Sequence, residues 1–135
     1  MTVSAQLNWT NAMQFVARAG DGPAIVLDSS DGGSGPGPME LVLIGVAGCT
    51  AIDVIMIMQK KRADIMDFKV NISGERADEH PKRYTSIHIE YVVSGRGIKP
   101  NAVEQAIRLS EEKYCSASAS LNADIESSYK IIDTG

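Results

Sequence analysis

The segment GPGPMELVLIGVAGCTAIDVIMIMQKKR, residues 35–62, dominates the organisation of the chain. Pro38 suits the first position of a helix, because its missing N–H would have no partner there in any case. From residue 41 to residue 58 only two side chains are clearly polar. The segment therefore predicts one long helix that ends near Arg62, is apolar almost all round and is buried by protein.

A transmembrane span is the alternative interpretation, because the apolar run is followed by the basic triplet at residues 60–62. Asp53 would then lie deep in hydrocarbon, at a cost of about 2.5–3.5 kcal/mol. The basic triplet is also typical of a helix C-terminus, where cations complement the helix dipole. We therefore expect a buried helix and no membrane contact. Asp53 lies four residues after Cys49 on the same face, and we interpret it as a buried hydrogen-bond anchor.

Composition narrows the class of protein. A chain of 135 residues predicts a single domain, residues 1–135, with room for a sizeable core. The net charge of −4 and the isoelectric point near 5.1 argue against a nucleic-acid surface. The N-terminus shows no signal-peptide pattern, and two cysteines are too few for a disulfide scaffold. We expect a cytoplasmic protein, in which a cysteine pair is more often catalytic or redox-sensing than structural.

Short strands are expected on both sides of the helix. The preceding ones are predicted at residues 2–8, 12–18 and 24–27, with a turn at WTN (9–11) and a Gly/Ser/Pro loop at 28–38. Beyond the helix, two alternating segments predict a β-hairpin or meander joined by the charged stretch 74–83. Their inward faces are formed by Phe68, Val70 and Ile72 in one strand and by Ile87, Ile89, Tyr91 and Val93 in the other.

The last third of the chain predicts helices and one final strand. Residues 101–114 form an amphipathic pattern, with Val103, Ile107, Ser110 and Tyr114 on one face. A break near Cys115 leads into a short helix at 116–123, and residues 124–132 predict a strand. The whole order is βββ-α-ββ-α-α-β, which defines the α+β class.

Cys49 and Cys115 are the only thiols. A free cysteine often only fills space in a core, and that reading stays open for Cys49. Cys115 stands at the start of a new helix, where backbone N–H groups stabilise a thiolate and lower its pKa. A zinc set with His80 and His88 lacks the usual ligand spacing, and no phosphate-binding motif occurs. We therefore expect neither a metal nor a bound cofactor.

The helix segment 35–62 and the segment LSEEKYCSASASL, residues 109–121, resemble the two cysteine segments of the OsmC/Ohr family, the osmotically inducible and organic hydroperoxide resistance proteins. The wording GPMELVL…AGCTAID is similar to the YhfA-like branch of that family. The resemblance covers essentially the whole chain. It implies an OsmC-like subunit with a long buried central helix, an intertwined homodimer and active sites at the subunit interface.

The resemblance also implies a thiol-dependent peroxidase that reduces organic hydroperoxides in oxidative stress defence. Cys49 would attack the peroxide and become a sulfenic acid, and Cys115 would condense with it to a disulfide. An external dithiol, such as a lipoyl group, would reduce the disulfide. The family activates its thiolate with a Glu and an Arg. Met39 stands at the usual Glu position, so Glu40 and Arg18 are the candidates for these two roles.

Two other functions remain open at this point. One is a non-catalytic dimeric binding protein that holds a small hydrophobic or thiol ligand in an apolar interface pocket. The other is a redox sensor in which a Cys49–Cys115 bridge alters a partner surface. The two suitably placed cysteines count against the binding protein, whereas the redox sensor shares the thiol chemistry of the peroxidase but not its output.

Overall fold

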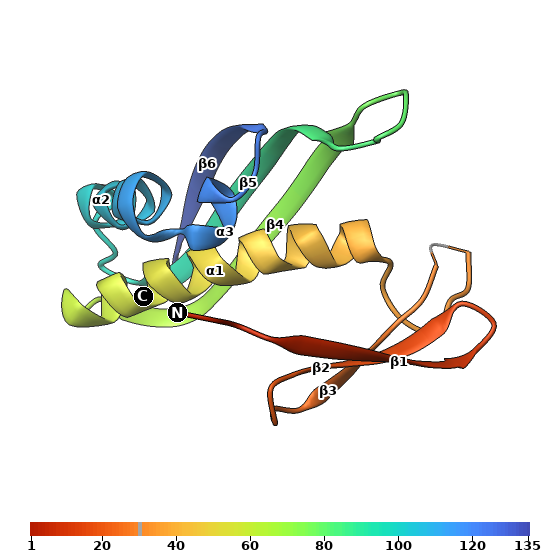
Figure 1. Cartoon of the computed structure of the whole chain (residues 1–135). Helices are drawn as coiled ribbons and strands as arrows, with labels where there is room; N and C mark the ends of the chain where they lie inside the picture. Colours follow the sequence, from red (N-terminus) through yellow and green to blue (C-terminus); the bar gives the residue numbers. More distant parts are fainter. Residues whose placement is uncertain (30) are drawn as a thin grey trace. The chain divides into compact units, whose positions relative to one another are not determined.

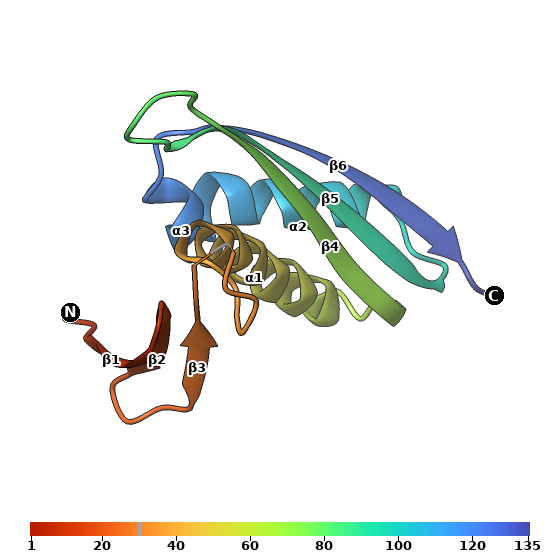
Figure 2. The same cartoon turned by 90° about the vertical axis from the view of Figure 1, so that its right-hand side faces the viewer.

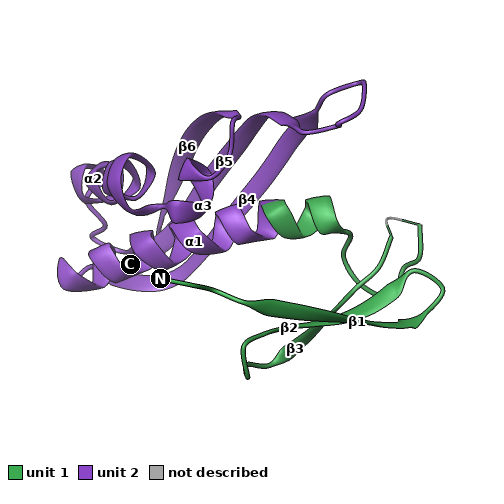
Figure 3. Cartoon of the chain, viewed as in Figure 1, with its two compact units in different colours: residues 1–42 green, residues 43–135 purple. Residues whose placement is uncertain are grey.

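The computed structural model describes residues 1–29 and 31–135, so that Ser30 in the predicted loop 28–38 lies outside the described residues. The chain divides into two compact units, Met1–Val42 and Leu43–Gly135 (Figure 3). That the whole chain is one domain stays a prediction. The predicted order of elements is confirmed, with one extra π-helical turn (Figure 1). The elements are β1 (Ala5–Asn11), β2 (Gln14–Ala19), β3 (Ala24–Leu27), α1 (Pro38–Lys60), β4 (Asp64–Arg76), β5 (Tyr84–Arg96), α2 (Pro100–Leu109), η1 (Ser110–Tyr114), α3 (Ser116–Ala119) and β6 (Asp124–Asp133).

In the first unit, β1, β2 and β3 form an antiparallel sheet in that order. The turn predicted at residues 9–11 is wrong, because these residues belong to β1 and the chain reverses at Ala12 and Met13. Ala12 takes the left-handed conformation, with φ of 47°, and its carbonyl accepts a 2.8 Å bond from Trp9 Nε1. The reversal therefore depends on backbone geometry at a residue that carries no turn signal.

This small sheet has almost no core of its own. Every residue of β1 is exposed, and Leu7, Trp9 and Ile25 are 53%, 67% and 50% exposed. Small sheets need a packed hydrophobic face for independent stability. The first unit therefore presents apolar side chains that its own strands do not cover.

The second unit holds the main core. Its sheet has the order β4-β5-β6, with β5 antiparallel to β4 and parallel to β6. Helices α1 and α2 lie on the same face of this sheet (Figure 2). The predicted inward face of β5 is confirmed, because its members are at most 2% exposed: Ile87, Ile89, Tyr91 and Val93.

Helix α1 has well-defined ends. Leu41 N–H bonds to the Gly37 carbonyl at 2.9 Å, and Pro38 takes the first helical position as predicted. The helix ends two residues earlier than predicted, because Arg62 takes the left-handed conformation with φ of 59°. Ala63 N–H then reaches back to the Met58 carbonyl at 3.1 Å, and Arg62 N–H to Gln59 at 3.0 Å. These two bonds define a Schellman motif that has an arginine where glycine is usual.

The prediction that α1 is buried all round is wrong for a single chain. The buried residues recur every fourth position along one face: Val46, Thr50, Val54 and Met58. Ile44, Ile52 and Met56 are 55%, 64% and 46% exposed. By length and composition α1 could cross a membrane, a test that core helices of soluble proteins also pass. The apolar residues of α1 therefore form two faces. One face packs in the core, and the other is not covered by any part of the same chain that the structure describes.

The predicted amphipathic helix 101–114 is interrupted. Its first part, α2, buries Val103, Ala106 and Ile107. The chain then widens into the π-helical turn η1, which keeps Ser110 buried but leaves Tyr114 49% exposed. A π-turn adds one residue to the helical repeat, so Cys115 is buried in place of Tyr114. The predicted place of Tyr114 on that face is therefore wrong.

Candidate functional site

The two cysteines lie together in the second unit. Cys49 occupies the middle of α1 and is half-buried, whereas Cys115 follows η1 and is 4% exposed. Both thiols are free, and Cys49 lies close enough to Cys115 to help raise the pKa of its thiol. The structure thus brings together two residues that are 66 positions apart in the sequence (115 − 49).

Ser118 is the local partner of Cys115. The Sγ of Cys115 lies 3.0 Å from the Oγ of Ser118, and either group can donate the hydrogen bond. Burial raises the pKa of the Cys115 thiol, while the hydroxyl and the backbone N–H of Ser118 act in the opposite direction. The expected lowering of this pKa at the helix start is therefore wrong in its net direction, because burial outweighs the local donors.

The backbone of Cys115 is held by the π-helical turn. Its N–H donates to the Ser110 carbonyl at 2.7 Å, a bond that spans five residues instead of the four of an α-helix. Its own carbonyl accepts the Ala119 N–H at 3.2 Å and so starts α3. Cys115 therefore stands at the junction of two short helical segments, with both of its backbone polar groups paired.

A chain of buried hydroxyls runs beside the thiols. Thr50, the residue after Cys49, has its Oγ1 2.7 Å from the Tyr91 hydroxyl and 2.8 Å from the Ser110 hydroxyl. Ser110 donates in turn to Asp53 at 2.9 Å. Thr50, Tyr91 and Ser110 are all completely buried. The chain connects α1, β5 and η1 through side chains alone.

Proton counting limits the direction of these bonds. Each hydroxyl carries one proton, and a carboxylate only accepts. Ser110 donates to Asp53 and therefore accepts in its contact with Thr50. Tyr91 also donates to Glu111 Oε1 at 3.2 Å, so three hydroxyl protons serve four contacts. Burial raises the pKa of Tyr91 well above its ordinary value, which keeps the phenol protonated and able to donate.

Asp53 is therefore the hydrogen-bond anchor that the sequence predicted, although it is half-buried and not fully enclosed. The other members of this hydroxyl chain have no distinctive sequence pattern. Tyr91 and Ser110 follow the periodicity of buried faces, and Thr50 is a polar interruption of the helix. The one available signal was Thr50 itself, a polar residue next to a cysteine in an apolar run.

The two tentative activating residues lie in the first unit. The carboxylate of Glu40 accepts the Gly37 N–H at 2.9 Å, which caps the start of α1 in the manner of a capping box. Arg18 lies on β2, where its backbone pairs with Gln6 and Ala24, and its side chain is exposed. Roles for Glu40 and Arg18 at Cys49 stay predictions.

A cleft of about 450 Å³ opens between α1 and α2 beside the hydroxyl chain. Asp53 belongs both to the hydroxyl chain and to the lining of this cleft. Tyr114, which directly precedes Cys115 in the sequence, also lines the cleft. Apolar side chains and lysines complete the lining: Met56, Ile57, Leu109, Lys60 and Lys61, with Gln105. Its size is within the range of small-molecule sites.

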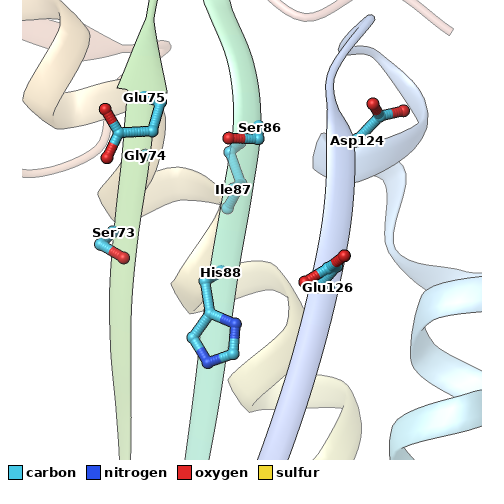
Figure 4. Close-up of a pocket in the computed structure, with 8 residues that line it drawn as sticks. All are labelled: Ser73, Gly74, Glu75, Ser86, Ile87, His88, Asp124 and Glu126. Carbon is cyan, nitrogen blue, oxygen red and sulfur yellow. The ribbon is translucent and has the colours of Figure 1, made fainter.

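A second hollow of about 310 Å³ lies on the sheet formed by β4, β5 and β6 (Figure 4). It is polar and acidic, and His88 lines it together with Glu75, Asp124 and Glu126. His88 and His80 are both exposed, as expected for solvated histidines. Among residues 1–29 and 31–135, no group of three or more His, Cys, Asp or Glu could hold a metal ion. Neither this hollow nor the cleft between α1 and α2 is lined by a cysteine.

An α+β subunit with a thiol pair held between its long helix and a late helix junction defines the class of protein. Comparison with known proteins agrees, because the family model of OsmC-like proteins matches residues 31–130. The chain belongs to the OsmC-like family. It is 38% identical over 132 residues to Protein YhfA of Escherichia coli, a match that covers 96% of this chain and 98% of that protein.

Solved structures show the same fold. A hypothetical protein from Aquifex aeolicus superimposes with a TM-score of 0.83 and 33% identity, over 98% of this chain and 99% of that one. The organic hydroperoxide resistance protein OhrB of Bacillus subtilis superimposes with a TM-score of 0.63 over 96% and 98% of the two chains. Its identity of 16% shows the fold alone. Bacterial proteins of this family are soluble.

Proposed function

We propose that this protein is a thiol-dependent peroxidase that reduces organic hydroperoxides. The observation that carries the proposal is the proximity of two free thiols that differ in exposure, Cys49 and Cys115. The half-buried thiol of Cys49 is open to a peroxide, whereas Cys115 is almost completely enclosed. This difference assigns the peroxidatic role to Cys49 and the resolving role to Cys115. Family membership and the fold of the Ohr proteins support a peroxide-related role.

The reaction has three balanced steps. The Cys49 thiolate attacks one peroxide oxygen, the O–O bond breaks, and the leaving alkoxide takes a proton to become the alcohol. The Cys115 thiolate then attacks the Cys49 sulfenic acid, its S–O bond breaks, and the leaving hydroxide takes a proton to become water. An external dithiol, such as a lipoyl group, reduces the resulting disulfide by exchange and is itself oxidised.

The apolar cleft beside Asp53 suits the organic part of such a substrate. It adjoins the hydroxyl chain, and its apolar lining favours an alkyl or aryl group over water. The proposal places the protein in the reducing cytoplasm, with no membrane or nucleic-acid partner. Its partners are the hydroperoxide, the dithiol and a second copy of the chain.

A homodimer is part of the proposal. The exposed face of α1 carries Ile44 and Ile52, and the first unit exposes further apolar side chains. Gly45 and Gly48 lie in the same helix, and a Cβ at either would meet nothing within 4 Å. Glycine inside a helix costs about 1 kcal/mol relative to alanine, and nothing within the chain needs these two to be small. Close approach of a second copy explains both the glycines and the uncovered apolar face.

The dimer also bears on activation of Cys49. Glu40 precedes Cys49 by nine residues on one helix, which is about 13 Å along an ideal axis and beyond the reach of its side chain. If Glu40 acts on a thiolate, that thiolate belongs to the second copy. We propose the same for the charge of Arg18. Glu40→Gln separates the two functions of this residue, because glutamine still caps Gly37 but has no charge.

The test is turnover of cumene hydroperoxide with a dithiol reductant. The wild type should consume peroxide, Cys49→Ser should not, and Cys115→Ser should complete only the first step. Arg18→Ala should slow oxidation of Cys49, and Glu40→Gln should do so without loss of stability. A wild type that is no faster than Cys49→Ser would remove the catalytic assignment.

A second candidate is a non-catalytic binding protein for a small hydrophobic or thiol ligand. The engagement of the Glu40 carboxylate at the start of α1 favours it, because that group is then not free to activate a thiol. Native mass spectrometry would detect a co-purified ligand. A bound ligand together with a Cys49 that does not react with hydroperoxide would select this function over the first.

A further inference from the structure

We propose that Thr50 and Ser110 are positioning residues that clamp the Cys115 turn against the Cys49 helix. The inference rests on the proposed pairing of the two thiols. It goes beyond that pairing because it names the groups that set the distance between them. Neither residue touches a reacting atom in this scheme, and each acts through the backbone of a cysteine.

Ser110 makes the connection with two different groups. Its hydroxyl bonds to two residues of α1, Thr50 at 2.8 Å and Asp53 at 2.9 Å. Its carbonyl accepts the Cys115 N–H at 2.7 Å. Thr50 is the residue directly after Cys49. One serine therefore joins the backbone of the second thiol to the helical turn that carries the first.

The π-helical turn is what makes this connection possible. In a continued α-helix the Ser110 carbonyl would accept the N–H four residues later, from Tyr114. The wider turn passes that bond to Cys115, five residues after Ser110. π-Turns of this kind are rare and occur frequently at functional sites. Here the turn delivers the second thiol to the clamp.

Burial makes the clamp persistent. Thr50 and Ser110 are both completely buried, so neither hydroxyl can exchange its partner for water. A buried hydroxyl without a partner is costly, and the two groups therefore stay together. The Tyr91 hydroxyl, 2.7 Å from Thr50, adds a third buried hydroxyl to the pair. The clamp is thus part of a larger group of buried hydroxyls and not an isolated contact.

The property that the clamp controls is the equilibrium between dithiol and disulfide. With oxidised dithiothreitol the two thiols lose two electrons and two protons and form one S–S bond, and the reagent becomes its dithiol. The equilibrium constant rises with the effective concentration of one thiol near the other. A clamp that fixes Cys115 against Cys49 raises that concentration and makes the disulfide harder to reduce.

The experiment measures this equilibrium in the full-length protein with dithiothreitol and no peroxide. Thr50→Val and Ser110→Ala should each lower the constant by about tenfold, the order expected for one lost buried hydrogen bond. For a two-electron couple this is a shift of about 30 mV toward less negative potential. Thr50→Ser, which keeps the hydroxyl, should stay within about twofold of the wild type.

Thr85→Val is the matched control, because it removes the same hydroxyl from a strand contact with the Glu75 carbonyl. It should leave the potential unchanged. Circular dichroism selects folded variants, and either Thr50→Val or Ser110→Ala alone decides the question. Equilibrium constants for Thr50→Val and Ser110→Ala within twofold of the wild type would overturn the proposal. An equal fall of the constant in Thr50→Ser and Thr50→Val would also overturn it. Lack of peroxidase activity would not, since the measurement uses no peroxide.

Discussion

Cys115 shows how two local effects compete at one residue. Its thiol is enclosed by protein, which raises its pKa, and it is also contacted by the Ser118 hydroxyl and N–H, which favour the thiolate. Burial dominates, so at neutral pH the resolving cysteine is mostly a thiol. A thiol that must lose its proton before it attacks makes the resolving step sensitive to pH.

The first prediction concerns Ser118→Ala. Loss of the hydroxyl should raise the pKa of Cys115 further and slow disulfide formation by roughly tenfold at pH 7.5, the order expected for a hydrogen bond to a charged group. The rate should recover as the pH rises through and beyond 9, the ordinary pKa of a cysteine thiol, because the Cys115 thiolate then forms without help from the serine. Acid quenching followed by mass spectrometry measures the rate. Oxidation of Cys49 itself should be unchanged, and a rate equal to the wild type at every pH would contradict the prediction.

The sequence predicted the two cysteines as a pair but not the residues that hold them. Thr50 meets partners 41 and 60 positions away, and no local pattern reports contacts at that distance. Tyr91 and Ser110 follow the spacing of buried faces, and a buried hydroxyl follows the same periodicity as an apolar side chain. Their role depends on tertiary contacts alone.

The two helical ends differ in how well sequence describes them. Pro38 marks the start of α1 because its preference is local and strong. The end is set by Arg62 in a conformation that arginine rarely adopts, so the basic triplet alone placed it two residues late. The π-turn has no sequence signal, because the α-helical pattern of residues 101–114 continues through residues 110–114.

The unusual cap gives a second prediction. Arg62→Gly should raise the free energy of unfolding by roughly 0.5–1 kcal/mol, because glycine adopts a positive φ without the steric cost of a side chain. Lys61→Gly is the matched control, and it should lower stability because Lys61 still bonds to the Ile57 carbonyl as part of the last turn. Urea titration at one fixed protein concentration measures both. A fall in stability for Arg62→Gly would show that the Schellman motif does not set the helix end.

For the molecule as a whole, the order of elements follows from the alternation of polar and apolar residues. What the sequence could not show is which chain covers an apolar face. Hydropathy indicates that a side chain avoids water. It does not indicate whether another part of the same chain or a second protein chain covers that side chain. Ile52 is therefore predicted to be buried and is 64% exposed within one chain.

The third prediction follows from that exposed face. Light scattering should find the wild type as a dimer at micromolar concentration. Gly45→Leu should shift it toward monomer, because a Cβ at this position meets nothing within 4 Å in its own chain and the added side chain would block a second helix. Asn71→Leu, on the exposed face of β4, is the control and should stay dimeric. A monomeric wild type, or a Gly45→Leu protein that dimerises as well as the wild type, would contradict the prediction.

The central claim, that Cys49 and Cys115 complete one oxidation cycle, is tested most directly by mass spectrometry after one equivalent of cumene hydroperoxide. The wild type should lose the mass of two hydrogen atoms and give a peptide that joins Cys49 to Cys115. Cys115→Ser should instead retain one added oxygen on Cys49. A wild type that keeps both thiols free, or that carries oxygen on Cys49 with no bond to Cys115, would contradict the account.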